Sequence, residues 1–440
     1  MPSDDLTRDT IAAIATPAGR GGIGIVRVSG PGVPRVAAAV LGKLPQPRLA
    51  MFGSFRDRQG ETIDQGVALY FPAPHSYTGE AVLELQGHGG PVVMQALLSA
   101  CVDAGARIAE PGEFTRRAFL EGKLDLAQAE AVADLIDAAS REAARSALRS
   151  LSGEFSAAIG ALQARLVELR AVTEAMLDFP EEQVDALHRE DAAARLAQAQ
   201  SALGEVLAKS RQGSLLRGGI HVVLAGRPNV GKSSLLNRLA GEDRAIVTPI
   251  PGTTRDALRE PMLIEGVPIV MVDTAGLRES RDEIERLGIQ RTRQELERAD
   301  LVIAVFEANR GPDALQDLPA ASARIDIYNK IDLAPGFVPP GEALAVSART
   351  GAGLEALRQR ILAAAGWSTG GEPVFLARER HLRALERAAA HLAAAAGETP
   401  RWEFFAEELR LAHAALGSIT GEFSADDLLG EIFKRFCIGK

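Results

Sequence analysis

The segment 226–233, which reads Gly-Arg-Pro-Asn-Val-Gly-Lys-Ser, constrains the fold of this chain more than any other stretch of its sequence. It has the spacing G-x-x-x-x-G-K-[ST] of a phosphate-binding loop, and it directly follows an apolar run at 220–225. Such a loop turns backbone N–H groups toward phosphate oxygens, while its lysine reaches the β- and γ-phosphates and its serine hydroxyl ligates magnesium. The segment therefore predicts a strand, a loop and a helix that bind a nucleoside triphosphate.

The residues around this loop predict a doubly wound, Ras-like P-loop α/β domain. Short β-branched runs alternate with helical segments, at 220–225, 269–273, 301–306, 325–329 and 343–346. Gly213, Gly218 and Gly219 interrupt the helical pattern before the first run, and Gly366 and Pro373 follow the last. We expect this domain to occupy residues 213–370.

Helical patterns lie on both sides of the α/β segment. Apolar residues recur at steps of three and four from Leu148 to Met176 and predict one long helix, and Leu382, Leu385 and Leu392 share a later face. We infer a helical bundle of residues 123–212 and 371–440, with the α/β domain inserted in it. Residues 1–122 alternate β-rich runs with Gly and Pro, which is typical of an α+β domain. The expected fold class is multidomain, with α/β, all-α and α+β parts.

The composition restricts the class of protein. With 440 residues, 46% of them hydrophobic and 24% charged, the chain is expected to be soluble and multidomain rather than disordered. It has two cysteines, no signal-like segment at its start and no apolar run long enough to span a membrane, so we expect a cytoplasmic protein without membrane contact. The net charge of -9 disfavours a uniformly basic nucleic-acid binder, so any such contact requires a local basic patch.

Two further motifs predict the rest of a magnesium and γ-phosphate site. The residues Asp273, Thr274, Ala275 and Gly276 end an apolar run, which places a carboxylate near the metal and a glycine amide near the phosphate. Thr253 and Thr254 follow Gly252 and lie between this motif and the phosphate loop, where a switch threonine completes the metal ligands.

A third motif predicts the base. Asn329, Lys330 and Asp332 follow the run at 325–329, and the aspartate can accept hydrogen bonds from both N1–H and the exocyclic amine of guanine. Adenine offers neither donor at these positions, so the site is predicted to be specific for GTP. Ser347 and Ala348 follow the next run and supply a loop that supports the base. Together with the phosphate loop, these motifs predict a GTPase.

The catalytic residue is less clear from the motifs alone. Leu277 stands where Ras-like GTPases carry a water-orienting glutamine, and it cannot position a nucleophile. Candidates are an acid further along, at Glu279, Glu283 or Glu285, a cation, or an arginine from a partner. The alternative is that these acids form the exposed first turn of a helix, which we favour for Glu279 and Glu283.

Two other features allow more than one interpretation. Arg116 and Arg117 could contact phosphate, but an adjacent pair of arginines is more typical of a solvated helix face. Cys437 lies near the end of the chain among Lys434, Arg435 and Lys440, whose charges favour a thiolate. On the local sequence alone, we favour a cysteine without a role.

Several segments, taken together, resemble the MnmE (TrmE) family of tRNA modification GTPases. They are TIAAIATPAGRGGIGIVR at 10–27, YTGEAVLELQGHGG at 77–90, PGEFTRRAF at 111–119, KLDLAQAE at 123–130 and CIGK at 437–440, combined with the inserted GTPase. The resemblance covers essentially the whole chain. It implies a folate-binding amino-terminal domain similar to glycine-cleavage aminomethyltransferase, a helical domain and an inserted GTPase domain.

The resemblance also implies an activity and partners. The expected protein is a homodimer whose two copies contact each other through their amino-terminal domains. It works with the flavoprotein MnmG in a heterotetramer. The pair places an aminomethyl or carboxymethylaminomethyl group on C5 of the wobble uridine of tRNA, with a one-carbon unit from 5-formyl- or methylene-tetrahydrofolate. The implied cofactors are GTP, magnesium, potassium and this folate.

Site residues follow from the resemblance position by position. The folate contacts are Arg27, Glu84, Lys123 and Lys440, with Cys437 nearby as a catalytic candidate. Glu285 orients the attacking water and Arg278 supports the switch. Magnesium is held by Ser233 and Thr254, and potassium by Asn229, Thr248, Ile250 and Thr253. The remaining GTP contacts are Val230, Gly231, Lys232, Ser234, Pro249, Pro251, Gly252, Asp273, Thr274, Ala275, Gly276, Asn329, Lys330, Asp332, Ser347, Ala348 and Arg349.

Two alternatives remain. A ribosome-assembly GTPase of the Era or Der type is disfavoured, because no basic Gly-x-x-Gly loop of a KH domain follows Pro373 and no second phosphate loop exists. A folate aminomethyltransferase with a vestigial GTPase is disfavoured by the full set of GTP motifs.

Overall fold

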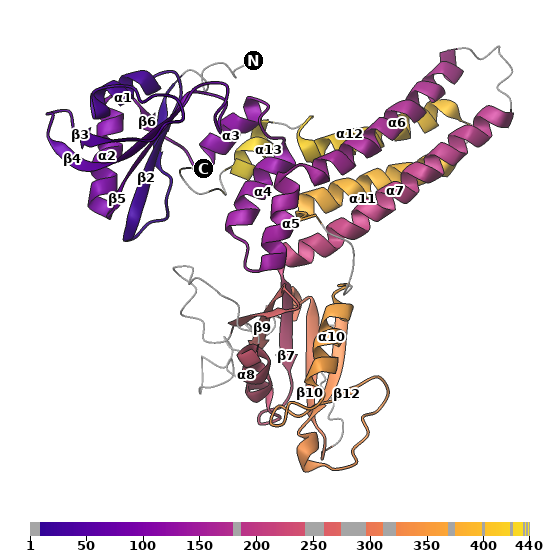
Figure 1. The fold of residues 1–440 in the computed structure, drawn as a ribbon. Coiled ribbons are helices and arrows are strands. Elements are labelled where there is room, and N and C mark those ends of the chain that lie inside the picture. The colour runs from indigo at the N-terminus through magenta and orange to yellow at the C-terminus, as the bar shows by residue number, and fades with distance from the viewer. Residues whose placement is uncertain are drawn as a thin grey trace, which may run out of the picture. The chain divides into compact units, whose positions relative to one another are not determined.

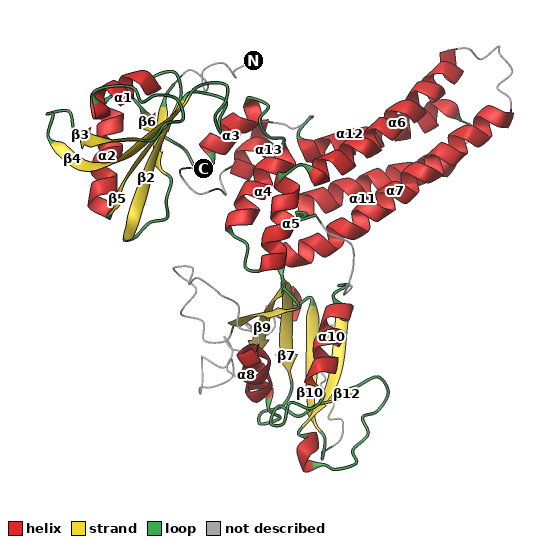
Figure 2. Cartoon of the chain, in the orientation of Figure 1, coloured by secondary structure: helices red, strands yellow, loops and turns green. Residues whose placement is uncertain are grey.

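The computed structural model describes residues 9–178, 186–242, 259–273, 296–310, 323–367, 375–397, 401–422, 426–433, 436 and 439. The chain forms two compact units, Met1–Ala133 with Gly417–Lys440 and Asp134–Leu416. Each contains one six-stranded sheet. Figure 1 follows the chain from one end to the other, and Figure 2 separates helices from strands.

The sheet of the first unit is mostly antiparallel, in the order β3-β4-β5-β2-β1-β6. Its strands are β1 (Ile11–Ile14), β2 (Gly21–Ser29), β3 (Met51–Arg56), β4 (Thr62–Phe71), β5 (Val82–Gly89) and β6 (Arg107–Ile108). Helices α1 (Val33–Leu41) and α2 (Pro91–Asp103) cover one face (Figure 1). Their apolar sides and the inward residues of the strands form one core that includes Val26, Phe55 and Leu85.

The end of the chain packs against this unit. Helices α3 (Glu113–Leu120), α4 (Leu126–Ile136) and α13 (Asp426–Phe433) share an apolar cluster that includes Leu126, Phe433 and Phe436. Gly439 lies so close to β1 that a Cβ atom there would be 2.4 Å from the carbonyl oxygen of Ile14. Gly439 is therefore held beside the amino-terminal sheet.

The helices of the second unit include α5 (Arg141–Leu151), α6 (Glu154–Asp178), α7 (Ala186–Gly218), α11 (Glu379–Gly397) and α12 (Trp402–Thr420), which continues into the first unit. Helix α7 packs along both α6 and α11 (Figure 1). The single long helix predicted from Leu148 to Met176 is wrong, because the chain turns between α5 and α6 at Gly153, whose φ is 90°. Leu148 is 55% exposed and does not belong to an apolar stripe.

The prediction that Gly213 interrupts the helical pattern is also wrong, since α7 runs on to Gly218. A Cβ atom at Gly213 would be 1.5 Å from the carbonyl oxygen of Phe375. Because Gly213 has no side chain, the backbone of Phe375 can pack closely against α7, which continues as a helix through this position. The domain boundary at 213 stays a prediction.

The second sheet has the order β12-β11-β10-β7-β9-β8 and is parallel except for the β8 and β9 pair. Its strands are β7 (Ile220–Ala225), β8 (Arg259–Ile264), β9 (Val267–Asp273), β10 (Leu301–Glu307), β11 (Ala323–Asn329) and β12 (Leu344–Ala345). Helices α8 (Lys232–Glu242) and α10 (Leu354–Ala364) pack on it. The predicted α/β runs are confirmed. Among the described strands of this sheet, β8 has no counterpart in the prediction; it lies at the edge, and its short apolar run from Met262 to Ile264 follows the charged pair Arg259 and Glu260.

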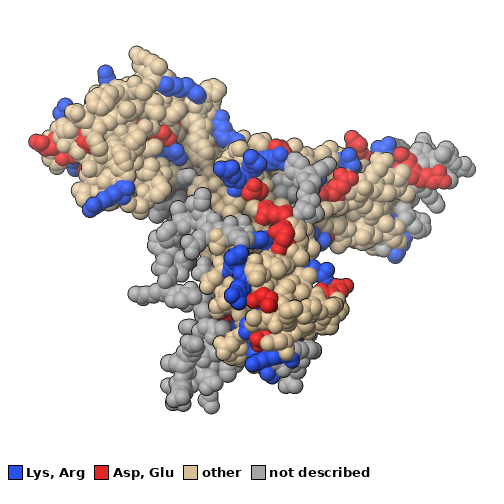
Figure 3. All heavy atoms as spheres, turned by 60° about the horizontal axis from the view of Figure 1, so that its bottom comes forward, with Lys and Arg blue, Asp and Glu red and all other residues tan. Residues whose placement is uncertain are grey.

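Two surface properties bear on function. No helix of the described residues is long and apolar enough to cross a membrane. On the face that Figure 3 shows, lysines and arginines form small groups among acidic residues and do not merge into a broad basic surface.

Candidate functional site

The phosphate loop connects β7 to α8, and its lysine is folded onto the loop itself. Lys232 Nζ donates hydrogen bonds to the carbonyl oxygens of Gly226 at 2.9 Å and Arg227 at 3.0 Å. The side chain is 4% exposed. A buried ammonium group at a helix amino terminus, with backbone N–H groups beside it, is the arrangement that binds phosphate.

The backbone of this loop requires its particular residues. Gly231 has a φ of 95°, and a Cβ atom there would be 2.4 Å from Nδ2 of Asn329. Asn229 has a φ of 65°, which asparagine adopts more readily than most residues. Its side chain is exposed, and the described residues offer it no hydrogen-bond partner.

One predicted magnesium ligand, Ser233, lies beside Asp273, the carboxylate that the sequence places near the metal. Ser233 Oγ donates to Asp273 Oδ2 at 2.6 Å, because β7 and β9 are neighbours and Asp273 ends β9. A hydroxyl and a carboxylate within hydrogen-bond distance are oxygen donors of the kind that magnesium prefers, so the residues present fit this metal. Thr254 lies outside the described residues.

Asn329 joins the phosphate loop to the base-supporting loop. Its Nδ2 donates to the carbonyl of Val230 at 2.9 Å, and its Oδ1 accepts from the backbone N–H of Ala348 at 3.0 Å. Because Asn329 is 1% exposed, both bonds are sheltered from water. Asn329 therefore fixes the two loops relative to each other.

Lys330 and Asp332 are each held by a neighbour. Lys330 Nζ donates to the carbonyl of Asn229 at 2.7 Å and to Glu307 Oε1 at 3.0 Å. Asp332 Oδ1 accepts from Ser347 Oγ at 2.6 Å, and Arg349 lies 3.9 Å from Oδ2. Sequence reasoning missed Glu307, although an acidic residue at the end of the apolar strand β10 was a usable signal.

Several predicted GTP-site residues lie outside the described residues. They are Thr248, Pro249, Ile250, Pro251, Gly252, Thr253, Thr254, Thr274, Ala275, Gly276, Leu277, Arg278, Glu279, Glu283 and Glu285. Their roles stay predictions. Ser234 is described and lies exposed in the first turn of α8.

The predicted folate residues Arg27 and Glu84 are cross-strand partners on β2 and β5. Glu84 Oε1 accepts from Arg27 Nε at 3.0 Å and lies 2.9 Å from its NH2 group. Arg27 NH1 also donates to the carbonyl of Gly439 at 3.5 Å, so the end of the chain reaches this pair. Cys437 and Lys440 themselves lie outside the described residues.

Two aromatic rings flank the same guanidinium. The Arg27 Cζ atom lies 5.7 Å from the ring centre of Tyr77 and 5.8 Å from that of Phe114. Tyr77 shares a hydrogen bond of 2.8 Å with Thr115, and burial raises the pKa of its phenol. Lys123 belongs to the same region, since a Cβ atom on Gly79 would be 3.3 Å from its Cε.

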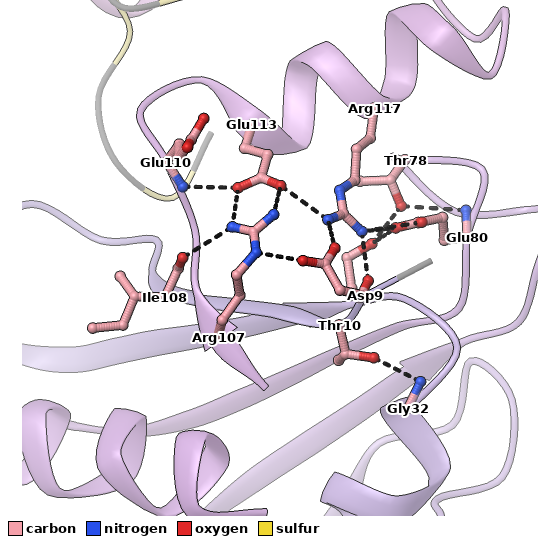
Figure 4. A network of polar contacts seen from close by, with 11 residues as sticks. Asp9, Thr10, Gly32, Thr78, Glu80, Arg107, Ile108, Glu110, Glu113 and Arg117 are labelled. Carbon is pink, nitrogen blue, oxygen red and sulfur yellow. Dashed lines mark hydrogen bonds and ion pairs between the residues drawn. The ribbon is translucent and has the colours of Figure 1, made fainter. Parts of the chain in front are cut away.

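A network of charged residues lies in the same unit (Figure 4). Arg117 bonds to Glu80, Glu113 and Asp9, and Arg107 bonds to Glu113 and Asp9. Arg117 is 2% exposed, so the interpretation of its arginine pair as a solvated helix face is wrong for Arg117. The sequence could not show this, because the acidic partners come from distant segments.

The arginines determine the ionisation of Glu113 and Asp9 in this network. Burial alone would raise the pKa of Glu113, but hydrogen bonds from Arg107, from the backbone of Glu110 and from Arg117 outweigh it and leave the pKa lowered. The same balance, with bonds from Arg107 and Arg117, lowers the pKa of Asp9. Both carboxylates are therefore held in the charged form.

The sequence is similar to known proteins over nearly its whole length. A family model described as the MnmE helical domain matches residues 126–437, and one described as the GTP-binding protein TrmE N-terminus matches residues 10–123. The tRNA modification GTPase MnmE of Azoarcus sp. (strain BH72) is 60% identical over 443 residues, which cover 98% of either chain. That of Dechloromonas aromatica (strain RCB) is 58% identical over 446 residues, which cover 98% of this chain and 99% of the relative.

Two solved structures of GTPase proteins are similar to part of this chain. An Era variant of Aquifex aeolicus bound to GDP and aluminium fluoride is 27% identical, covers 39% of this chain and 65% of its own, and has a TM-score of 0.27. The G domain of the T. maritima FeoB iron transporter is 29% identical, covers 33% of this chain and 98% of its own, and has a TM-score of 0.26.

Proposed function

The chain belongs to the MnmE family of tRNA modification GTPases, and from this premise we propose how its two sites divide the work. The second unit hydrolyses GTP. The first unit binds a tetrahydrofolate one-carbon carrier, either 5-formyl or methylene. With the flavoprotein MnmG, the protein places an aminomethyl or carboxymethylaminomethyl group on C5 of the wobble uridine of tRNA.

The observation that carries the folate part is the arrangement around Arg27. The Arg27 guanidinium donates both to the Glu84 carboxylate on the neighbouring strand and to the carbonyl of Gly439, which is 412 residues further along the chain. The Glu84 carboxylate suits the amine donors of a pterin, and the cations Arg27, Lys123 and Lys440 suit the carboxylates of a glutamate tail. If the end of the protein chain is held at Arg27 and Glu84, Cys437 lies near the folate carrier. There we propose that the Cys437 thiol acts in the transfer of the one-carbon unit.

The nucleotide site supports the following division of roles. Lys232 binds the β- and γ-phosphates, and Asp332 recognises guanine by hydrogen bonds. Asn329 and Lys330 hold the phosphate loop and the base-supporting loop in place. Ser233 and Thr254, with Asp273 behind them, would hold magnesium, which neutralises charge on the phosphates when bound. We propose that Glu285 orients the attacking water, because Leu277 cannot, and that Arg278 supports the switch.

We further propose that potassium stimulates hydrolysis. Asn229 supports a potassium-binding role, because its side-chain amide is exposed at the phosphate loop. Its backbone carbonyl instead accepts a hydrogen bond from Lys330. Thr248, Ile250 and Thr253 would supply the other oxygen ligands. Potassium should then accelerate GTP hydrolysis strongly and sodium weakly, as measured by phosphate release. Asn229→Ala should abolish the difference, and equal rates in both salts with the unmutated protein would exclude a potassium site.

The proposed assembly is a cytoplasmic homodimer, joined through its amino-terminal domains, in a heterotetramer with MnmG. Size-exclusion chromatography with light scattering, on the protein alone and mixed with MnmG, measures both masses. A protein that stays monomeric alone and in the mixture would contradict this assembly.

The function as a whole is tested in cells. Delete the gene, digest bulk tRNA and measure 5-substituted uridines by mass spectrometry, then complement with the unmutated protein, Arg27→Ala and the control Arg20→Ala. Arg20 is exposed and directly precedes β2, so its variant should restore the modification, whereas Arg27→Ala should not. Unchanged tRNA after deletion would exclude the tRNA assignment and favour the ribosome-assembly alternative.

A further inference from the structure

The charged network of Asp9, Glu80, Arg107, Glu113 and Arg117 has no part in either proposed site, yet it adjoins one of them. Tyr77, whose ring flanks Arg27, is three residues from Glu80 in the segment between β4 and β5. Phe114, whose ring also flanks Arg27, lies on α3 and directly follows Glu113. The network thus contacts both backbone segments that carry the two rings.

We propose that Arg117 is a positioning residue for the folate site. Through Glu80 and Glu113 it holds the Tyr77 segment and α3 at the separation that keeps both rings against Arg27. This inference rests on the proposed folate binding and adds to it a set of residues that do not touch the folate.

The hydrogen bonds of Arg117 support this role. Its NH1 group donates to both carboxylate oxygens of Glu80 at 3.1 Å, and its NH2 group donates to Glu113 Oε1 at 2.9 Å. One planar guanidinium therefore joins the two segments. Because its fork of donors has a fixed geometry, lysine cannot make the same set of bonds.

Each acid is itself held in place. Besides its one bond from Arg117, Glu113 accepts two bonds from Arg107 and a bond of 2.8 Å from the backbone N–H of Glu110. Glu80 Oε2 accepts from Ser29 Oγ at 2.7 Å, on the same strand as Arg27. The network is thus anchored on β2, on the turn before α3 and on the Tyr77 segment (Figure 4).

A direct bond completes the connection. The Tyr77 hydroxyl and Thr115 Oγ1 are 2.8 Å apart, so the ring is tied to α3 one residue after Phe114. Arg27 is then surrounded by Glu84, by two rings and by the Gly439 carbonyl. A guanidinium whose position is fixed before binding loses less conformational entropy when a ligand arrives, and this raises affinity.

The first experiment measures affinity. Titrate the full-length protein with 5-formyltetrahydrofolate by calorimetry, as the unmutated form, Arg117→Lys and Arg116→Lys. Arg116 lies on the same helix, is half-buried and has no ion pair among the described residues, so it is a matched control. Arg117→Lys should weaken binding about tenfold, the effect of losing a charge-assisted hydrogen bond, and Arg116→Lys should not change it. GTP hydrolysis should persist in all three.

The second experiment needs no folate. Record the ultraviolet titration of the Tyr77 phenol as the difference between each protein and the same protein carrying Tyr77→Phe. Since burial raises the pKa of Tyr77, release of the ring should move its ionisation toward the ordinary value of about 10. Arg117→Lys should cause this shift although it preserves the charge, and Arg116→Lys should not.

A pair of variants covers the case in which Arg117→Lys disturbs folding. Thr115→Val removes the hydroxyl that bonds to Tyr77, and Thr115→Ser keeps it. Thr115→Val should release the ring and move its ionisation toward the ordinary value, whereas Thr115→Ser should leave the ionisation unchanged. A rise of the pKa in Thr115→Val would mean that only the hydrogen bond, which lowers the pKa of Tyr77, was lost. If no variant shifts either the ionisation or the folate affinity, Arg117 does not position the rings. If the unmutated protein binds no folate but Arg117→Lys still shifts the ionisation, the folate proposal fails and the positioning role stands.

Discussion

At the scale of single residues, the proposed specificity for guanine depends on how one carboxylate is held. Asp332 receives a hydrogen bond from Ser347 on one oxygen, and this bond orients the carboxyl group. Ser347 is fully buried and also accepts from the backbone of Thr350, so the support is rigid. A base that offers two donors can therefore bond to an acceptor pair that is already aligned.

Asp332→Asn should change the preferred nucleotide. The amide donates where the carboxylate accepted, so GTP should lose roughly 1–3 kcal/mol of binding and xanthosine triphosphate should gain. Hydrolysis rates with GTP, ATP and xanthosine triphosphate measure the shift. Asp326→Asn, a change to a half-exposed carboxylate on β11, is the control and should leave the preference unaltered. Equal use of ATP and GTP by the unmutated protein would contradict the assignment.

Acid should weaken the charged network of the first unit. The pKa values of Asp9 and Glu113 are lowered in the folded protein, so the unfolded chain binds more protons in acid. Their contribution to stability is fully present above the unfolded pKa values, about 4, and is lost as the pH falls through the lower folded values. Hydrogen exchange of the α3 amides at pH 7, 5 and 3 measures the loss, and Arg107→Gln should make the dependence shallower. If the protection of the α3 amides from hydrogen exchange did not change with pH, the network would not stabilise this region.

At the scale of elements, one aspartate joins the two chain segments that lead into and out of the α/β sheet. Asp134 is 8% exposed and accepts from Arg217 at the end of α7 at 2.9 Å and from Arg378 before α11 at 2.8 Å. Ser150 Oγ bonds to the backbone of Leu376 beside them. Helix α5 adds Ala143 and Ala147 to the core of the sheet. The sheet and the helices of this unit are thus joined by packing as well as by charge.

Asp134→Ala should destabilise this junction. Removing the acid leaves two arginines without their shared counter-charge, which costs about 1–3 kcal/mol because Arg217 is partly exposed to water. Thermal unfolding measured by circular dichroism should show a lower Tm. Asp137→Ala changes an exposed acid nearby and serves as the control. Equal Tm values for both variants would contradict a structural role for Asp134.

At the scale of the whole molecule, the described residues of each proposed site all belong to one compact unit. The nucleotide residues from Asn229 to Arg349 belong to the second unit, and Arg27, Glu84 and Lys123 belong to the first. The two binding reactions therefore depend on separate sets of contacts.

Binding at the two sites should be separable by mutation. Lys232→Ala should abolish GTP binding and leave the affinity for 5-formyltetrahydrofolate unchanged, whereas Arg27→Ala should do the reverse. Calorimetric titrations of both variants with both ligands test this. Loss of both affinities in either variant would show that the sites are not independent.

The sequence by itself determined the phosphate loop, the guanine motif, the parallel strands and the family. These features depend on short contiguous segments, in which the spacing of residues sets the backbone geometry directly. Only the tertiary structure decided that Arg117 is buried, that Glu307 holds Lys330, that Gly439 reaches Arg27, and that the chain turns at Gly153 and not at Gly213. Each of these depends on which distant residues meet, since burial and charge pairing are set by neighbours in space that a local pattern does not contain.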